Sequence, residues 1–307
     1  KAQRFDQFQL IPTTTVYPLA HVVTDPQTGS ATVVAISAGL IDTFAWNGTS
    51  FVPSGAPSPN GAAGDAMGAT AGGLVYFDSL GRTSTRPSGG AWSTLTALTP
   101  SPSARGLAAM TNRVTSNGSA FLFGGGAGTT LTNDLWEFNG TSWINRTPTS
   151  GPLPVARQGA TLVSDGLGSL YMFGGTAANN SVLNDVWRFR SGLWQLINKA
   201  PIKRTYHAMM LDTVRNNFLV MGGMDSNGTV GTDAWTMSVT SDGSVQWTQV
   251  ATGRPCRIAS WAWSRPAPPP GSSIVLAASS CASRTSCRTM TACCCRRLHA
   301  PCSAIAW

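Results

Sequence analysis

Three short stretches decide the fold: FLFGG at 121–125, YMFGG at 171–175 and LVMGG at 219–223. Each ends an apolar run with a glycine pair, and the successive pairs are 50 and 48 residues apart. An arginine precedes each pair, and an aspartate and two tryptophans follow it in the same order. The repeated residues are Arg105, Arg157 and Arg204; Gly124 and Gly125, Gly174 and Gly175, Gly222 and Gly223; Asp134, Asp185 and Asp233; Trp136, Trp187 and Trp235; Trp143, Trp194 and Trp247. This common order indicates an internal repeat of about 50 residues.

A unit of about 50 residues with a glycine pair and a later tryptophan resembles the kelch motif. The chain is similar to kelch-repeat β-propellers of the bacterial type, which are related to the galactose-oxidase central-domain superfamily. The resemblance implies an all-β fold in which each unit forms one four-stranded blade. We expect about six blades, of which the last is degraded.

The unit at 157–203 predicts four strands. Their sequences are QGATLVSD, SLYMF, DVWRF and LWQLI, at 158–165, 169–173, 185–189 and 193–197. Between the third and fourth strands of the preceding unit lies Asn139-Gly140. Because Asn and Gly tolerate positive φ best, this pair predicts a type I′ hairpin turn.

Two weaker units precede the three clear ones. TFAWNGTSF at 43–51 aligns with LWEFNGTSW at 135–143, so that Asp42 corresponds to Asp134. The next unit, from about 61 to 99, contains the strand sequence LVYFD at 74–78 and Trp92. These segments predict the first two blades.

A sixth blade is expected to begin at Arg257, with SIVLA at 273–277 as its second strand. FQLIP at 8–12 is similar to the closing strand WQLIN at 194–198, so we expect residues 5–12 to complete this last blade and remove exposed sheet edges. Residues 1–278 would then form one propeller domain. The alternative is that the chain is a piece of a longer protein, and that 5–12 ends a blade further upstream.

Residues 279–307 form a tail rich in cysteine and arginine, expected to be irregular or a frameshift product. A shifted frame in a GC-rich gene would replace Gly, Asp and Val codons by Arg, Ala, Ser and Cys. A zinc site at 293–302 is disfavoured, because adjacent cysteines cannot all reach one ion. All seven cysteines lie after residue 253, and this odd number excludes a complete set of disulfides but not a partial one. A disordered extension is the remaining alternative.

The net charge of +8 does not predict nucleic-acid binding. Seven arginines between 254 and 307, where no acidic residue occurs, supply +7, so the rest of the chain carries only +1. No run of 18 apolar residues predicts a membrane span. We expect a monomer without a cofactor or bound metal, and the resemblance favours an extracellular or cell-surface location.

The recurring arginines are the candidate ligand-binding residues. Equivalent positions in successive blades form a ring around the axis, so guanidinium groups at the channel mouth could bind an anionic ligand such as a carboxylate-bearing sugar. The alternative is that each arginine pairs with an aspartate of the repeat as a structural bridge between blades. The four arginines are Arg105, Arg157, Arg204 and Arg257, and the candidate aspartates are Asp42, Asp134, Asp185 and Asp233. The glycines and tryptophans of the repeat are expected to be structural.

Resemblance to galactose oxidase would imply a copper ion held by Tyr and His, and a thioether between Cys and Tyr. The chain has three histidines, and no cysteine before residue 256 for the cross-link. Tyr206-His207 is the one adjacent Tyr and His, and we expect it to be a packed pair on a first strand. Copper oxidase chemistry is therefore not expected.

The function expected from these observations is a non-catalytic module that binds a protein or glycan through loops on one face. The loops are 126–133, 176–184 and 224–232, which join the second and third strands of their blades. The alternative is a carbohydrate-active enzyme with its site at the channel mouth, near the arginine ring.

Overall fold

The computed structural model describes residues 19–250, except 38–39, 48, 56–57, 60–65, 97, 112–117, 213–214 and 241–242. Within these ranges every helix or strand element is a β-strand, and none of the described residues forms a helix that could cross a membrane. Apart from two short two-stranded sheets in the loops, the strands form five antiparallel sheets, each a meander in which neighbours in sequence are neighbours in space. We number these sheets as blades 1 to 5 in chain order.

The blades have the following strands. Blade 1 contains β1 (Leu19–Thr24), β2 (Ala31–Ser37), β3 (Leu40–Trp46) and β4 (Phe51–Pro53), with β5 (Ser58–Pro59) paired to β3. Blade 2 contains β6 (Ala66–Thr70), β7 (Gly73–Phe77), β8 (Thr83–Arg86) and β9 (Ser93–Leu95). Blade 3 contains β10 (Ala109–Met110), β11 (Ala120–Phe123), β14 (Leu135–Phe138) and β15 (Trp143–Asn145). Blade 4 contains β17 (Thr161–Ser164), β18 (Leu170–Phe173), β20 (Asp185–Arg190) and β21 (Leu193–Lys199), and blade 5 contains β22 (Ala208–Asp212), β23 (Asn217–Met221), β24 (Ala234–Val239) and β25 (Val245–Gln249).

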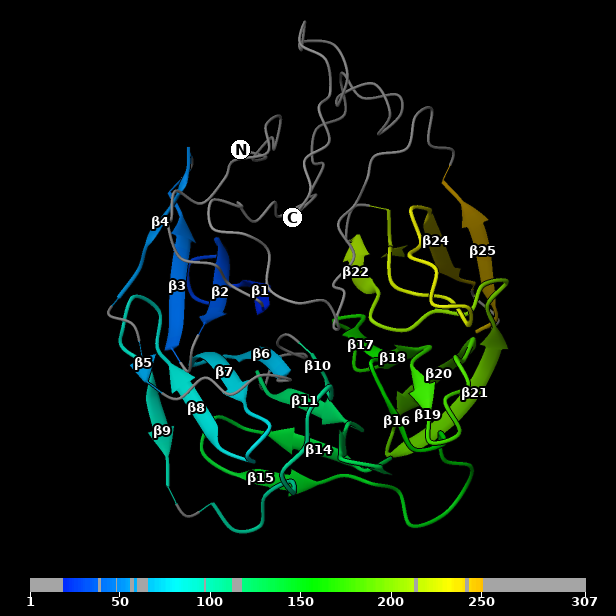
Figure 1. Ribbon diagram of the computed structural model, residues 1–307, viewed down its shortest axis with the longest axis horizontal. Helices are drawn as coiled ribbons and strands as arrows, with labels where there is room; N and C mark the ends of the chain where they lie inside the picture. Colours follow the sequence, from blue (N-terminus) through cyan, green and yellow to red (C-terminus); the bar gives the residue numbers. More distant parts are fainter. Residues whose placement is uncertain are drawn as a thin grey trace, which may run out of the picture.

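The five blades are arranged around a common centre (Figure 1). The first strands β1, β6, β10, β17 and β22 lie nearest that centre, and each contacts the first strand of the next blade. The fourth strands lie at the rim. The structure therefore confirms the expected all-β propeller with four-stranded blades.

Five blades lie within the described residues. The expected sixth blade beginning at Arg257, the closing segment 5–12 and the tail 279–307 lie outside them. The number six is compatible with this arrangement and stays a prediction, as does the assignment of 1–278 to one domain.

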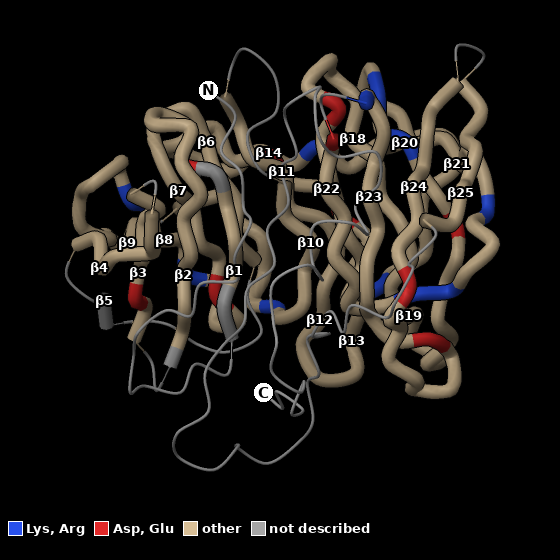
Figure 2. The backbone as a smooth tube through the Cα atoms, turned by 90° about the horizontal axis from the view of Figure 1, so that it is seen from above, with Lys and Arg blue, Asp and Glu red and all other residues tan. Residues whose placement is uncertain are grey.

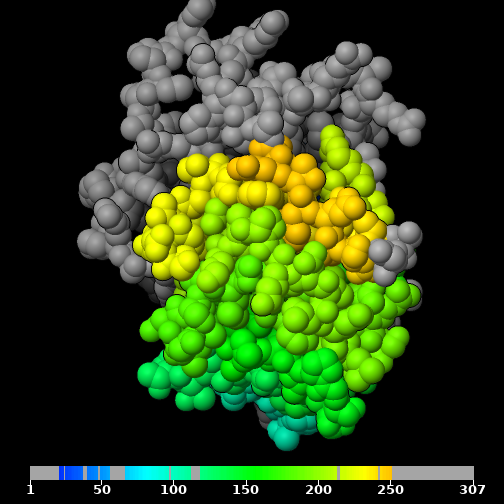
Figure 3. All heavy atoms as spheres, turned by 90° about the vertical axis from the view of Figure 1, so that its right-hand side faces the viewer, coloured from blue at the N-terminus to red at the C-terminus, as the bar shows by residue number. Residues whose placement is uncertain are grey.

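Apolar side chains fill the space between blades: four of the five core clusters combine residues of two neighbouring blades, and the fifth lies within blade 1. One cluster joins Val75 and Phe77 of blade 2 to Phe138 and Trp143 of blade 3. Two tryptophans at the rim also donate a hydrogen bond to the preceding blade: Trp143 Nε1 to Thr83 Oγ1 at 2.8 Å, and Trp92 Nε1 to Thr43 Oγ1 at 2.9 Å. Large flat side chains bury much apolar area here, which favours close packing of neighbouring sheets. Figure 3 shows blades 4 and 5 in close contact at the rim.

The loop at Asn139-Gly140 differs from the expected type I′ turn. Phe138 pairs with Trp143, so the loop spans the four residues 139–142, and of the two predicted turn residues only Gly140 has a positive φ, of 104°. The side chain of Asn139 accepts hydrogen bonds from the N–H groups of Thr141 (3.0 Å) and Ser142 (2.9 Å). The prediction was wrong in turn type, because the Asn side chain stabilises a longer loop that does not require Asn in the left-handed region.

The glycine pairs form the joints between blades. Gly125 N–H donates to the carbonyl oxygen of Arg157, and Gly175 N–H to that of Arg204, both at 2.8 Å. Gly124 and Gly174 have φ near +65° (64° and 66°), a region that disfavours any side chain. A Cβ on Gly174 would lie 2.3 Å from the carbonyl oxygen of Arg204. Glycine is therefore required both for the backbone angle and for the close approach of the next blade.

We expect Gly174→Ala to lower the free energy of unfolding by about 1–3 kcal/mol more than Gly192→Ala. Both glycines have a positive φ, 66° and 81°, so both substitutions strain the backbone. Only at Gly174 would the new Cβ meet another atom, because nothing lies within 4 Å of the corresponding position at Gly192. Urea unfolding followed by circular dichroism measures the difference, and equal losses would contradict the role of Gly174 in the joint.

Candidate functional site

The arginine of each clear repeat pairs with the aspartate of the same repeat. In blade 4, Arg157 Nη1 and Nη2 donate to the two carboxylate oxygens of Asp185 at 2.6 and 2.7 Å. Arg157 Nη1 also donates to the carbonyl oxygen of Gly174 at 2.9 Å. Trp187 Nε1 donates to Asp185 at 2.6 Å. The guanidinium thus forms a bidentate pair, the geometry that makes arginine–carboxylate contacts strong and directional.

The same arrangement recurs in the neighbouring blades. Arg105 makes two hydrogen bonds to Asp134, one of them at 2.9 Å, and Trp136 Nε1 donates to that carboxylate at 2.7 Å. In blade 5, Arg204 Nη2 and Trp235 Nε1 each donate to Asp233 at 2.6 Å. The arginine side chains are buried, with exposed fractions of 2% for Arg105, 0% for Arg157 and 12% for Arg204.

These contacts lower the pKa of all three carboxyl groups. Burial by itself would raise the pKa of Asp185, but the hydrogen bonds from Arg157 and Trp187 and the guanidinium charge outweigh burial and lower it. The same balance, with the equivalent arginine and tryptophan, lowers the pKa of Asp134 and Asp233. The aspartates are therefore ionised partners of their arginines at neutral pH.

This geometry corresponds to the structural bridge, the second of the two roles considered for the arginines. The expectation that this bridge joins two blades was wrong: Arg157 and Asp185 belong to the same blade. The main-chain carbonyl groups of Arg157 and Arg204 make the link to the preceding blade instead. Asp42 has a different place, in the middle of β3 opposite Ala35. Arg257 lies outside the described residues. A ligand-binding role for the ring stays a prediction.

We expect Arg157→Ala to lower the free energy of unfolding by about 3 kcal/mol, because it removes a fully buried guanidinium and leaves the carboxylate of Asp185, which is 16% exposed, without its partner. The control is Arg215→Ala, which removes a 52% exposed guanidinium that lies 2.6 Å from a carboxylate oxygen of Asp212. Exposed pairs contribute about 1 kcal/mol or less. The free energies of unfolding of the two variants, measured by chemical denaturation, test this difference. A stably folded Arg157→Ala protein that had lost binding of anionic sugars would instead support the ligand ring.

A ring of main-chain hydrogen bonds was not anticipated. Two residues after each arginine, Leu107, Gly159 and Tyr206 all have positive φ, of 57°, 64° and 55°. Gly159 N–H donates to the carbonyl oxygen of Leu107 at 3.0 Å, and Tyr206 N–H to that of Gly159 at 2.8 Å. Leu and Tyr rarely adopt this conformation, so the hydrogen bonds and the joints beside them hold them there. The equal spacing from each arginine was the signal that could have revealed the ring.

His207 is a buried titratable group between blades 4 and 5. Its Nε2 lies 2.7 Å from Thr161 Oγ1, and its ring packs edge-to-face on Phe173 at 4.7 Å between centroids. Nδ1 has no hydrogen-bond partner among the described residues. Burial, assisted by the charge of Arg204, lowers the pKa of His207 to about 3. The expectation of a packed Tyr-His pair matches this placement for His207, whereas Tyr206 is half-buried.

The folded protein is expected to lose stability as the pH falls from about 6.5 to about 4, the window set by an ordinary histidine pKa and the lowered values in the fold. In this window the unfolded chain binds a proton at His207 that the folded chain does not bind. Burial also lowers the pKa of His21, to about 4, so this residue acts in the same direction. Melting temperatures measured across this window should depend less on pH in His207→Gln than in the unmodified protein. An unchanged dependence would contradict the buried neutral state.

The three loops predicted as the contact surface have one common construction. Each leaves the second glycine of its pair, and that glycine's carbonyl oxygen accepts a hydrogen bond from the returning limb: from Thr132, Leu183 and Gly231, at 2.9, 2.9 and 2.8 Å. The outgoing limb also bridges to the segment after the arginine, as in β16 (Arg157–Gln158) paired with β19 (Thr176–Ala177). In blade 3 the two limbs are β12 (Gly126–Ala127) and β13 (Thr130–Leu131).

The loop tips share a face and a chemistry. β12, β13 and β19 lie along the same edge of the disc when it is seen from the side (Figure 2). The exposed residues at the three tips are 127–130, 178–181 and 226–230, with the sequences AGTT, ANNS and SNGTV. None is charged. Asp225, at the base of the third tip, uses one oxygen to accept the N–H groups of Asn227 (2.8 Å) and Thr229 (2.9 Å) within its own turn.

Within the described part of the chain, no three His, Cys, Asp or Glu side chains form a group that could bind a metal ion. In blade 2 the cationic group is Arg86 of β8, whose Nη2 donates to the carbonyl and hydroxyl oxygens of Ser54 at 2.8 and 2.9 Å. This link between blades 1 and 2 lies outside the repeat pattern, so the spacing of the arginines did not predict it.

Comparisons with known proteins agree with the propeller geometry. Residues 114–265 match the model of the KLHDC2/KLHL20/DRC7 Kelch-repeats domain. The Rho GTPase-activating protein gacHH of Dictyostelium discoideum is 37% identical over 123 residues, which are 36% of this chain and 8% of that protein. The tRNA wybutosine-synthesizing protein 4 of Emericella nidulans is 37% identical over 91 residues, 28% of this chain and again 8% of the relative. The chain thus spans a small part of these relatives.

A solved structure shows the same fold. The structure of YjhT superposes with a TM-score of 0.57 at 18% sequence identity, covering 75% of this chain and 83% of YjhT. At this identity the likeness concerns the fold alone.

Proposed function

We propose that this chain, which is a kelch-repeat β-propeller, is a non-catalytic binding module that uses loops 126–133, 176–184 and 224–232 to bind a protein or glycan partner. A kelch propeller is in general a fold of binding and scaffold modules, and the choice of surface and ligand is our proposal. The one observation that carries it is the common construction of the three loops on one face.

The loops combine a fixed base with adaptable tips. Each base is held by a hydrogen bond to the carbonyl oxygen of the second glycine, so the loop positions follow from the blades. The tips are exposed and made of Asn, Ser, Thr, Gly, Ala and Val. Small polar residues of this kind form hydrogen bonds to varied partners, as in antibody paratopes. A rigid base limits the entropy lost on binding.

The absence of charged residues at the tips favours a partner that is polar and uncharged. Hydroxyl and amide groups can donate and accept hydrogen bonds with sugar hydroxyls or with the main chain of a protein loop. A ligand recognised mainly by its charge would need ionised groups in the site. We therefore propose that these loops bind a ligand whose contacting surface is polar and uncharged.

The competing function, a carbohydrate-active enzyme at the channel mouth, requires the recurring arginines to contact the substrate. In this structure Arg105, Arg157 and Arg204 direct their guanidinium groups to Asp134, Asp185 and Asp233. Substrate binding there would have to break buried pairs, which carries a large free-energy cost. This cost supports the loop surface over the channel mouth.

The test is a triple variant with one change at each tip: Thr129→Ala, Asn180→Gly and Asn227→Ala. We expect it to lose binding to the ligands that the unmodified chain selects from a glycan array and a displayed peptide library, by about tenfold or more, because several hydrogen bonds contribute together. Asn180 has a φ of 61°, so glycine fits its backbone without strain. The melting temperature should change little.

The matched control changes an exposed residue at the opposite end of the strands, Leu167→Ser. Leu167 is 79% exposed in the turn between β17 and β18. This control should bind as the unmodified chain does. Retained binding in the tip variant, or an equal loss in the control, would refute the assignment of the loops, and the class of ligand selected decides between glycan and protein.

A further inference from the structure

Two arginines on β20 differ from all the others in the described part of the chain. Of the nine arginines described there, six lie within 2.7 Å of a carboxylate oxygen of Asp or Glu. A seventh, Arg86, is attracted by Asp25. Arg188 and Arg190 have no carboxylate partner among the described residues. Among the described arginines, these two are therefore the ones whose charge is not balanced by a described carboxylate.

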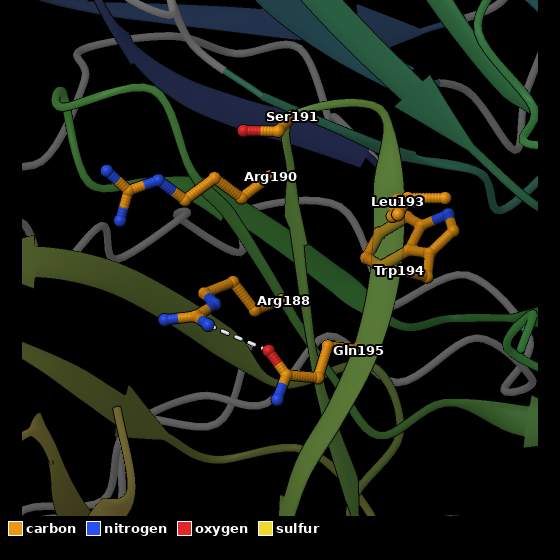
Figure 4. Close-up of a pocket in the computed structure, with 6 residues that line it drawn as sticks. All are labelled: Arg188, Arg190, Ser191, Leu193, Trp194 and Gln195. Atoms are coloured by element: carbon orange, nitrogen blue, oxygen red, sulfur yellow. Dashed lines mark hydrogen bonds between the residues drawn. The ribbon is translucent and has the colours of Figure 1, made fainter. Parts of the chain in front are cut away.

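The two charges occupy one side of one strand. Side chains two residues apart in a strand project from the same face, with Cα atoms about 7 Å apart. Figure 4 shows both guanidinium groups extending to the same side of the β20–β21 hairpin. Trp187 and Phe189, the residues that alternate with them, belong to the apolar cluster between blades 3 and 4. The fold therefore presents Arg188 and Arg190 together, away from that core.

The arginines line a cavity of about 350 Å³, together with Ser191, Leu193, Trp194 and Gln195. Arg188 Nη2 donates to Gln195 Oε1 at 2.7 Å, which orients its guanidinium without neutralising the charge. Leu193 is 51% exposed and gives the cavity an apolar border, while Arg190 is exposed. The site thus combines two cations, a polar amide and an apolar side chain.

This site is separate from the loop surface. Arg190 is the last residue of β20 and Leu193 the first of β21, so both lie at the turn between the third and fourth strands. The loop at 176–184 connects to the other end of β20. A ligand at the arginine pair and a partner on the loops would therefore occupy opposite ends of blade 4.

We propose that Arg188 and Arg190 form a docking site for an extended acidic peptide with two carboxylates at positions i and i+2. The spacing carries the argument: in an extended peptide, side chains at i and i+2 also project from one face about 7 Å apart, matching the two arginines. Each guanidinium then donates two hydrogen bonds to the oxygens of one carboxylate in a bidentate contact. The apolar border at Leu193 fits a small apolar residue beside the acidic pair.

The test compares labelled peptides by fluorescence anisotropy at about physiological ionic strength, where weak long-range attraction is screened. The first has the sequence Ser-Glu-Ser-Glu-Ser-Val, and the second, Ser-Ser-Glu-Glu-Ser-Val, has the same charge with carboxylates on opposite faces. We expect the full chain to bind the first peptide more tightly. Loss of a charge-assisted hydrogen bond should weaken binding about tenfold for each arginine, in Arg190→Gln and in the double variant Arg188→Gln, Arg190→Gln.

The control removes two exposed positive charges at the other end of blade 4, with Lys199→Gln and Lys203→Gln. It should bind the first peptide within about twofold of the unmodified chain, since exposed charges at this distance contribute little. The loop-tip triple variant should also bind normally. Equal binding of the two peptides, equal weakening by the lysine changes, or no binding of either peptide would overturn the proposal. Arg190 is exposed, so Arg190→Gln tests it even if the double variant does not fold.

Discussion

The interaction on which the structure depends is the joint between a glycine pair and the arginine of the next blade. The main chain of Arg157 accepts a hydrogen bond from Gly125 of blade 3, while its side chain binds Asp185 and the carbonyl oxygen of Gly174 in blade 4. One residue thus fixes the fold within its blade and the position of its blade against the previous one. The close contact at Gly174 leaves no room for a side chain.

The joint also determines where the apolar cores and the loops lie. Because adjacent first strands are held at a short distance, the wider space toward the rim requires large side chains, and Phe123 and Trp194 fill it with ring centroids 5.3 Å apart. The same glycine pairs begin the three loops, so the loop bases have a position set by the core. A binding surface placed in this way would be rigid at its base and variable at its tips.

The repeated letters of the sequence predicted the blades, the strands and the buried tryptophans, because each repeat must bury the same apolar surface against its neighbour. They left open which of two roles the arginines have, since pairing depends on where Asp185 lies in space. The turn at Asn139 was predicted wrongly from its dipeptide. Arg188 and Arg190 were overlooked: their alternation along DVWRFR was visible, but the lack of a neutralising carboxylate is a property of the folded chain.

The joint limits how blades can be added to such a propeller during evolution. Each of the three clear repeats contains both kinds of residue that make a joint: a glycine pair, whose N–H donates to the next blade, and an arginine, whose carbonyl oxygen accepts from the preceding blade at Arg157 and Arg204. Tandem duplication of one such repeat, from the arginine through the fourth strand, would add a blade with compatible ends. Exchange at other boundaries would separate the guanidinium of Arg157 from Asp185, so evolution by whole units is the route that this chemistry leaves open.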